Sequence, residues 1–265
     1  MQTVCGLDVH KDSVFACIVY ANGMKKEETY DVLTPSLERL RDDLLEAGVT
    51  SVAMESTSIY WIPIQRILNP HFEIWVANPL FIKQMPGRKN DQKDAEWIAE
   101  LHQSGFIKKS FIPNEISIEL RRYESRYFDL RRKHIRVATQ IDTVLQSCNI
   151  RISNYLSHIN RSKSYENVLT LIIAGETSIE KLLGCIHGRT RNKHGTETMR
   201  AAITGVIKDS DRRVLRQMQQ EKELIESQQQ ECISCMQEIV NSYCFEAYEL
   251  LLTLHGVKQL NALCI

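Results

Sequence analysis

The sequence has no net charge and no apolar run long enough to cross a membrane. Its 33 Lys and Arg residues are balanced by 33 Asp and Glu residues, so no overall basic excess indicates nucleic-acid binding. Any such function must rest on local clusters of basic residues. No apolar run reaches the ~18 residues of a membrane span, and the first residues begin a strand, not a signal peptide. We therefore expect a cytoplasmic protein that does not engage a membrane.

Cysteine occurs eight times, but without the spacing of a zinc site or a disulfide framework. Cys5 and Cys17 lie in apolar segments, where free thiols pack as small hydrophobic groups. Cys232 and Cys235 form a single C-x-x-C pair that lacks a second pair and nearby histidines, which argues against zinc. The cysteines indicate a reducing compartment.

Glycine and proline are absent from residues 114–149 and 211–252, and both segments carry helical patterns. The second would span roughly 60 Å as one helix at 1.5 Å per residue. Apolar residues recur there every seven positions, at Met218, Ile225, Cys232 and Ile239. Lys222 and Gln229 interrupt the second apolar position, so the pattern predicts a short or imperfect coiled coil. Between the two segments, glycines separate shorter predicted helices, and residues 187–195 form a basic, glycine-bounded loop.

Residues 1–112 contain five apolar segments that predict strands, interrupted by helical patterns. The expected strands cover residues 3–9, 13–20, 25–32, 51–55 and 72–77, and the expected helices begin at Thr34, Ser58 and Asn78. Three strands in a meander followed by alternating helices and strands is the order of a ribonuclease H-like α/β fold. Its mixed sheet is antiparallel at the start and parallel later, with the first and fourth strands adjacent.

Four carboxylates stand at the ends of these elements. Asp8 and Glu55 lie where adjacent strands end, one strand spacing of roughly 4.8 Å apart. Asp91 and Asp94 are three residues apart at an expected helix start, where side chains are neighbours. Taken alone, that pair is explained as well by an acidic helix N-terminus. Together, the four acids from three elements indicate a divalent-metal site of the phosphoryl-transfer kind.

The same stretches of sequence resemble IS110-type (DEDD) transposases. The resemblance is carried by four ordered blocks, Gly6-Leu7-Asp8-Val9-His10-Lys11-Asp12, residues 54–61, residues 76–79 and residues 90–95. The catalytic domain of that family is ribonuclease H-like, akin to the Holliday-junction resolvase RuvC. The resemblance implies that Asp8, Glu55, Asp91 and Asp94 form an acidic tetrad that holds Mg²⁺, with Mn²⁺ as an alternative.

The resemblance also implies a domain plan and partners. Residues 1–158 would be the RuvC-like catalytic domain, with a core at 1–112 and a long helix at 114–149. Residues 159–250 would form a helical, coiled-coil region, and 251–265 the start of a truncated C-terminal domain. In the family that last domain supplies a serine nucleophile; no segment here matches its block, so no nucleophile is assigned. The implied partners are DNA, a structured guide RNA and further copies of this chain.

Local clusters of basic residues supply candidate nucleic-acid contacts. They are Lys11, Arg88, Lys89 and Lys93 beside the acids, Arg121, Arg122, Arg126 and Arg132 in the first long helix, and Arg189 and Arg191 in the basic loop. For the long helix, a solvated charged face with Glu119, Glu124 and Asp129 as partners explains the pattern equally well.

Three functions fit the sequence. The first is an insertion-sequence transposase or recombinase that carries out Mg²⁺-dependent phosphodiester cleavage and strand transfer in DNA, present as a truncated copy. The second is a non-catalytic remnant that binds nucleic acid or oligomerises. The third is an actin-like ATPase, which shares the core topology but needs a second Gly-rich phosphate loop, and none follows Pro79.

Overall fold

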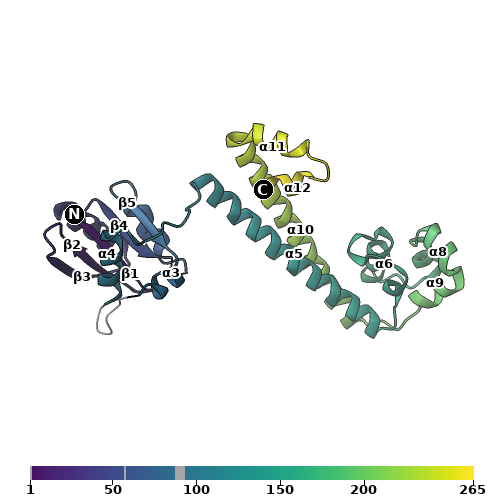
Figure 1. The fold of residues 1–265 in the computed structure, drawn as a ribbon. Helices are drawn as coiled ribbons and strands as arrows, with labels where there is room; N and C mark the ends of the chain where they lie inside the picture. Colours follow the sequence, from purple (N-terminus) through teal and green to yellow (C-terminus); the bar gives the residue numbers. More distant parts are fainter. Residues whose placement is uncertain (1, 57, 87–92) are drawn as a thin grey trace. The chain divides into compact units, whose positions relative to one another are not determined.

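The computed structural model describes residues 2–56, 58–86 and 93–265, which fall into two compact units. The first comprises residues 1–112 and the second residues 113–265, and each has its own apolar core (Figure 1). Within the described ranges, no helix is both long and apolar enough to cross a membrane. The domain boundaries expected at residues 158 and 250 remain predictions, because the division into two compact units does not test them.

The first unit is built on one mixed five-stranded sheet with the order β3-β2-β1-β4-β5. β1 pairs antiparallel with β2, and β2 with β3, whereas β1–β4 and β4–β5 are parallel. This arrangement confirms the predicted ribonuclease H-like topology, including the adjacency of the first and fourth strands. The strands are β1 Val4–Val9, β2 Ser13–Val19, β3 Lys25–Asp31, β4 Ser51–Glu55 and β5 Glu73–Ala77.

Two helices cover one face of the sheet, α1 (Thr34–Glu46) and α2 (Trp61–Leu68). Side chains alternate along each strand, so one set from β1, β2, β4 and β5 points into this core. Leu7, Met54, Leu40 and Leu68 are among its fully buried members. Full burial of one such side chain is worth about 1.5–3 kcal/mol, so this face supplies most of the unit's apolar stabilisation.

The opposite face carries α3 (Pro79–Gln84) and α4 (Asp94–Gln103). Val4, Cys17 and Val19 of the sheet pack there against Ala95 and Ala99 of α4. Burial raises the pKa of the Cys17 thiol to about 11, and burial also raises that of Cys5. Both cysteines are therefore uncharged core residues, in agreement with the prediction from sequence.

Helix starts in this unit differ from the prediction in two places. Leu33, not Thr34, is the N-cap of α1, and no side chain caps the helix. The second helix begins at Trp61 and not at Ser58, which has a positive φ of 51°. Pro63 consequently lies in the first turn, where its missing N–H has no intrahelical partner to lose, so no kink is required.

The second unit contains two long helices that lie side by side, α5 (Glu115–Ser147) and α10 (Asp209–Tyr243). They run antiparallel, because Arg126 contacts Gln228 whereas His134, further along α5, contacts Glu226. Asn114 caps α5 by accepting a hydrogen bond from the Ser117 N–H at 2.8 Å. The first long helix was predicted almost to the residue, whereas the second ends at Tyr243 instead of continuing to 252.

The coiled-coil pattern of α10 is more complete than the sequence suggested. Leu215, Lys222 and Met236 are buried at the second apolar position. The Lys222 ammonium lies 3.3 Å from carboxylate oxygens of both Glu166 and Glu226. Its aliphatic stem can pack in the helix–helix contact while the two carboxylates neutralise its charge. The interruption of the coiled coil that was expected at Lys222 therefore does not occur.

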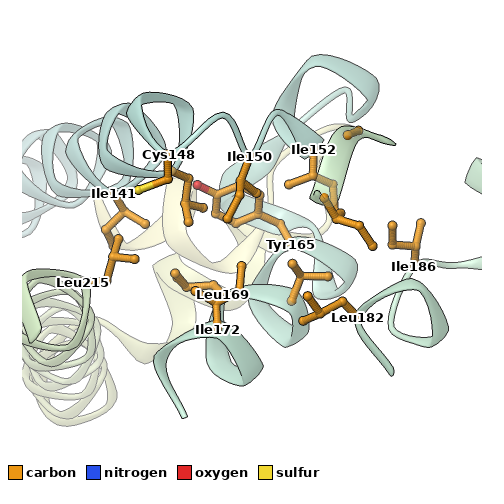
Figure 2. Packing of buried hydrophobic residues seen from close by; sticks show 14 of the residues in the cluster. Ile141, Cys148, Ile150, Ile152, Tyr165, Leu169, Ile172, Leu182, Ile186 and Leu215 are labelled. Atoms are coloured by element: carbon orange, nitrogen blue, oxygen red, sulfur yellow. The ribbon is translucent and has the colours of Figure 1, made fainter. Parts of the chain in front are cut away.

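The short helices that follow α5 and precede α10 in the chain share one apolar core with both long helices, which contribute Ile141 and Leu215 (Figure 2). Tyr165, Leu169 and Ile172 of one helix face Ile150 and Ile152 of the preceding segment. The basic loop predicted at 187–195 is wrong, because residues 188–194 form a helix between two glycines. The elements are η1 Ile152–Tyr155, η2 Ile159–Arg161, α6 Lys163–Ile173, α7 Ile179–Gly184, α8 Gly188–His194 and α9 Thr196–Ile203.

Apolar residues within 251–265 pack against the long helix α10. α11 (Phe245–Leu252) and α12 (Gln259–Leu263) follow α10. Ala262 and Leu263 are buried in one cluster with Met236 and Val240 of α10. The chain therefore folds back on its own long helix at this point.

The half-buried histidine His102 generates a prediction about pH. Its Nε2 lies 2.8 Å from Ser51 Oγ, its ring lies 5.2 Å from the Trp75 ring, and burial lowers its pKa against a small opposing effect of Glu73. Above about pH 6.5 the imidazole of His102 is neutral in both the folded and the unfolded chain. Below that pH the imidazole is protonated in the unfolded chain but stays neutral in the folded unit until its lower pKa is reached. Stability should therefore fall as pH drops from about 6.5 toward the folded pKa, by at most about 1.4 kcal/mol per pH unit.

The measurement is urea unfolding followed by tryptophan fluorescence, since all three tryptophans lie in the first unit. His102→Gln should lose this part of the pH dependence, whereas His71→Gln, at an exposed site, should keep it. Equal slopes in the two variants would show that His102 does not cause the effect.

Candidate active site

Asp8 lies near the end of β1, on the face of the sheet opposite the α1–α2 core. Its neighbours Leu7 and Val9 are buried in that core, so strand alternation directs Asp8 to the other face. Its side chain is 21% exposed, and Oδ2 lies 3.1 Å from Nε2 of His10 in the following turn. This hydrogen bond fixes one carboxylate oxygen and leaves the other available for a ligand.

Glu55 is the last residue of β4, the parallel neighbour of β1. The register pairs Leu7 with Met54, so Asp8 and Glu55 each follow directly after a paired residue. Ala53, two residues before Glu55, packs in the cluster that includes α4, which places Glu55 on the same face as Asp8. Both acids therefore stand at the carboxyl edge of adjacent parallel strands, where open α/β sheets bind ligands.

A close contact between β1 and α4 brings a third carboxylate to this edge. A Cβ at Gly6 would lie 2.3 Å from the Ala95 carbonyl oxygen and 2.4 Å from the Ala99 nitrogen. No side chain larger than hydrogen fits there without moving the helix backbone. α4 begins at Asp94, one residue before Ala95, so this contact sets the position of the Asp94 backbone.

Asp8 and Asp94 line one pocket with a volume of about 600 Å³. The pocket extends from the end of β1 across β2 and β3 to the first turn of α4. Its lining residues in the described part of the chain are Asp8, Phe15, Ala16, Glu27, Glu28, Thr29, Lys93, Asp94 and Ala95. Four of these nine residues are acidic and one, Lys93, is basic.

Ion pairs fasten α4 to the edge of the sheet beside the pocket. Lys25 of β3 binds Glu96 at 2.6 Å and Glu100 at 2.5 Å. Hydrogen bonds with Glu100 and then Glu96 raise the pKa of Lys25, which stays charged. Lys93 pairs with Glu27, and the same hydrogen bond raises the pKa of Lys93. These pairs hold the start of α4, and with it Asp94, against β3.

The structure thus unites two of the four predicted acids in one pocket and places the third at the neighbouring strand end. Asp91, with Arg88 and Lys89, lies outside the described residues. Within the ranges that are described, no three His, Cys, Asp or Glu side chains are close enough to hold one metal ion. α4 begins at Asp94 with Lys93 as its N-cap, and the predicted pairing of Asp91 with Asp94 stays a prediction.

Comparison with known protein families gives a match to a transposase family, the IS110-type DEDD transposases, over residues 5–150. That span covers more than half of the chain and includes Asp8, Glu55 and Asp94. The chain belongs to this family. The match agrees with the motif resemblance and with the strand order that carries the acids.

Other comparisons add less to this IS110-type chain. No curated protein matches it. A solved structure of RuvC from T. thermophilus in complex with Holliday junction substrate is similar at 12% sequence identity, over 42% of this chain and 100% of that chain, with a TM-score of 0.29. The ribonuclease H-like assignment rests on the sheet order of the chain itself.

The candidate nucleic-acid contacts of this transposase-family chain differ in how strongly they are engaged. Lys93 is paired with Glu27, Arg132 with Asp129, and Arg126 donates to Gln228 at 3.1 Å. Lys11, Arg121, Arg122 and Arg189 are exposed and make no such side-chain contact within the described residues. Arg191 is half-buried, and its Nε has no hydrogen-bond partner among the described residues. The four exposed side chains are the best placed to meet phosphates.

Sequence reasoning missed Gly6 and Phe15 as parts of the site. Gly6 stands within the first family block, and its spacing two residues before Asp8 puts both on one face of β1. That spacing could have indicated a close approach. Phe15 sits in an apolar strand and carries no local signal, because its exposure depends on where α4 starts.

The Gly6 contact predicts a specific cost for adding one methyl group. Gly6→Ala should lower the free energy of unfolding of the first unit by about 1–3 kcal/mol, because backbone atoms of α4 must move away. Urea unfolding followed by tryptophan fluorescence measures this change. As the control, Gly23→Asn adds a larger side chain in a turn where nothing lies within 4 Å, at a φ of 85° that asparagine tolerates. If both variants behaved alike, the close approach would not govern the docking of α4.

Proposed function

We propose that this IS110-type chain is a DNA transposase or recombinase whose first unit binds Mg²⁺ through Asp8, Glu55, Asp91 and Asp94, with Mn²⁺ as an alternative ion. The observation that supports this proposal best is the arrangement of three acids from three elements. Asp8 and Glu55 end adjacent parallel strands, and Asp8 shares a pocket with Asp94. Family membership supplies the reaction class, which is cleavage and transfer of DNA strands.

The donor set fits a hard divalent cation. Carboxylate oxygens are the ligands that Mg²⁺ prefers, and Mg²⁺ commonly uses one or two carboxylates together with water and substrate phosphates. Asp8 and Asp94 meet that requirement within one pocket. Glu27 is paired with Lys93, and Glu28 lies 3.7 Å from both Lys26 and Arg39. Asp8 and Asp94 supply negative charge at the same pocket, which a divalent ion would offset.

The chain's own residues have separable tasks in this proposal. A bound ion would orient a phosphodiester and offset charge on its attacking and leaving oxygens. His10 holds one oxygen of Asp8 and so directs the other toward the pocket. The β1–β4 pairing fixes the spacing of Asp8 and Glu55, while Gly6 fixes the approach of Asp94. Rigid elements, not loops, therefore carry three of the four acids.

The proposal for strand transfer needs one further group. In the family resemblance a serine supplies the nucleophile, and no segment of this sequence matches its block. We therefore assign cation binding and DNA binding to the residues at hand, and no nucleophile. A structured guide RNA and a second copy of the chain remain proposed partners on the same resemblance.

A second candidate function is nucleic-acid binding without catalysis. The observation that favours it is a pair of exposed arginines on α5 that do not line the acidic pocket. Exposed Arg121 and Arg122 on α5 would serve this function without any metal. The two functions make different predictions for the effect of divalent ions.

Divalent metal should stabilise the first unit. An ion that binds only the folded state adds about 2.7 kcal/mol at a hundredfold excess over its Kd. Tryptophan-detected melting with and without Mg²⁺ should show this shift in the wild type and lose most of it in Asp8→Asn. Asp12→Asn, an exposed carboxylate in the adjacent turn, is the matched control and should keep the shift. An equal shift in both variants would rule out the acidic site and favour the non-catalytic alternative.

Duplex binding should depend steeply on salt. Each phosphate neutralised releases counterions, so the slope of log K against log salt should be about −0.9 per contact. Replacing Arg121 and Arg122 by Gln should make the slope shallower by nearly twice that amount if both contact phosphates. Lys181→Gln removes a cation already paired with Glu176 at 2.7 Å and should leave the slope unchanged. Fluorescence anisotropy with labelled duplex measures both, and a slope unaffected by the arginine changes would assign these residues to ordinary surface.

A further inference from the structure

We propose that Phe15 is a stacking platform for a nucleobase of the DNA strand that enters the acidic pocket. This inference rests on the proposed function and deepens it by assigning a base-binding subsite beside the acids. It starts from uneven burial along one face of β2. Phe15 is 40% exposed, whereas Cys17 and Val19, which point to the same face, are buried.

The exposure of Phe15 follows from the point at which α4 begins. Cys17 and Val19 lie on the same face of β2 as Phe15, and Ala95 and Ala99 cover them. Because α4 starts only at Asp94, the helix does not extend over the part of the sheet that contains Phe15. An aromatic ring is thereby left uncovered at the mouth of the acidic site.

The register places Phe15 directly beside Asp8. Asp8 pairs with Phe15 across β1 and β2, and Phe15 pairs with Thr29 across β2 and β3. Directly opposite side chains on one face are about 4.5–5.5 Å apart at Cβ. Asp8, Phe15 and Thr29 all line the same pocket as Asp94. A strand whose phosphate lies at Asp8 and Asp94 would therefore have an attached base within reach of the Phe15 ring.

His10 links the ring to the acid. Its imidazole makes an edge contact with Phe15, with centroids 5.6 Å apart and an interplanar angle of 85°. The same imidazole is hydrogen-bonded to Asp8. The two contacts restrain the aromatic ring relative to the carboxylate, which is the rigid placement that a stacking platform requires.

The pocket suits a base better than a second phosphate. Its volume of about 600 Å³ is adequate for a nucleotide-sized group. Glu27 and Thr29 line the pocket beside Phe15, and Lys93, the only cation in the described lining, is already paired with Glu27. The described lining therefore offers a second phosphate no free positive charge, whereas a neutral base gains stacking on an aromatic face.

Binding of a short single-stranded oligothymidylate tests the proposal, with an abasic oligomer of equal length as the second probe. Stacking of one base on an aromatic side chain corresponds to a loss on the order of tenfold when the ring is removed. Phe15→Ala should weaken oligothymidylate binding by about that factor and leave the abasic oligomer unaffected. Phe15→Leu should behave like Phe15→Ala, because an apolar side chain without a flat ring cannot stack.

Two further variants keep the test decisive. Phe15→Trp should retain affinity, and its added fluorescence should be quenched by oligothymidylate but not by the abasic oligomer. Phe106→Ala removes another exposed phenylalanine of the same unit that does not line the pocket, and it should change neither affinity. Tryptophan-detected melts of each variant check that the first unit is folded.

Three results would overturn the inference. They are absence of oligothymidylate binding by the wild type, equal weakening of both probes in Phe15→Ala, and a loss in Phe106→Ala as large as that in Phe15→Ala. Absence of the Mg²⁺ shift in the wild type would contradict the proposed metal site alone. Metal binding at Asp8 with no effect of Phe15 substitutions would contradict only the stacking subsite.

Discussion

The contact between Gly6 and the backbone of α4 is the constraint on which the candidate site depends. Where a Cβ at Gly6 would meet Ala95 and Ala99, the helix instead rests on the strand itself. The contact has two consequences, since it seats Asp94 beside Asp8 and fixes where the helix stops covering β2. The acidic pair and the uncovered Phe15 ring are thus products of one close approach.

The fold of the first unit could be derived from local patterns because each element carries its own signal. Short apolar runs identify β1, β2, β4 and β5, and the order of strands and helices then leaves few topologies. Asp8 and Glu55 could be placed for the same reason, since both end a strand with an evident apolar pattern. Helix starts were less well defined, because the first turn of α2 and of α4 is set by packing and not by a capping side chain.

Features that depend on long-range packing were not readable from the sequence. Lys222 looked like a break in the coiled-coil pattern, yet Glu166 from a different helix helps to neutralise it. The basic segment at 188–194 looked like a loop because glycines bound it, yet seven residues suffice for a short helix. Leu263 lies in the segment expected to begin a truncated domain, and α10 provides its packing surface. For Lys222 and Leu263 the deciding contact comes from another helix.

The account makes one central claim, that Asp8 and the acids beside it bind a divalent cation at the carboxyl edge of the sheet. Anomalous scattering from Mn²⁺ in crystals of the protein tests it most directly. We expect one or two Mn²⁺ ions bonded to a carboxylate oxygen of Asp8 and to at least one of Glu55, Asp91 and Asp94. Mn²⁺ bound elsewhere, with Asp8 engaged only by His10, would contradict the claim.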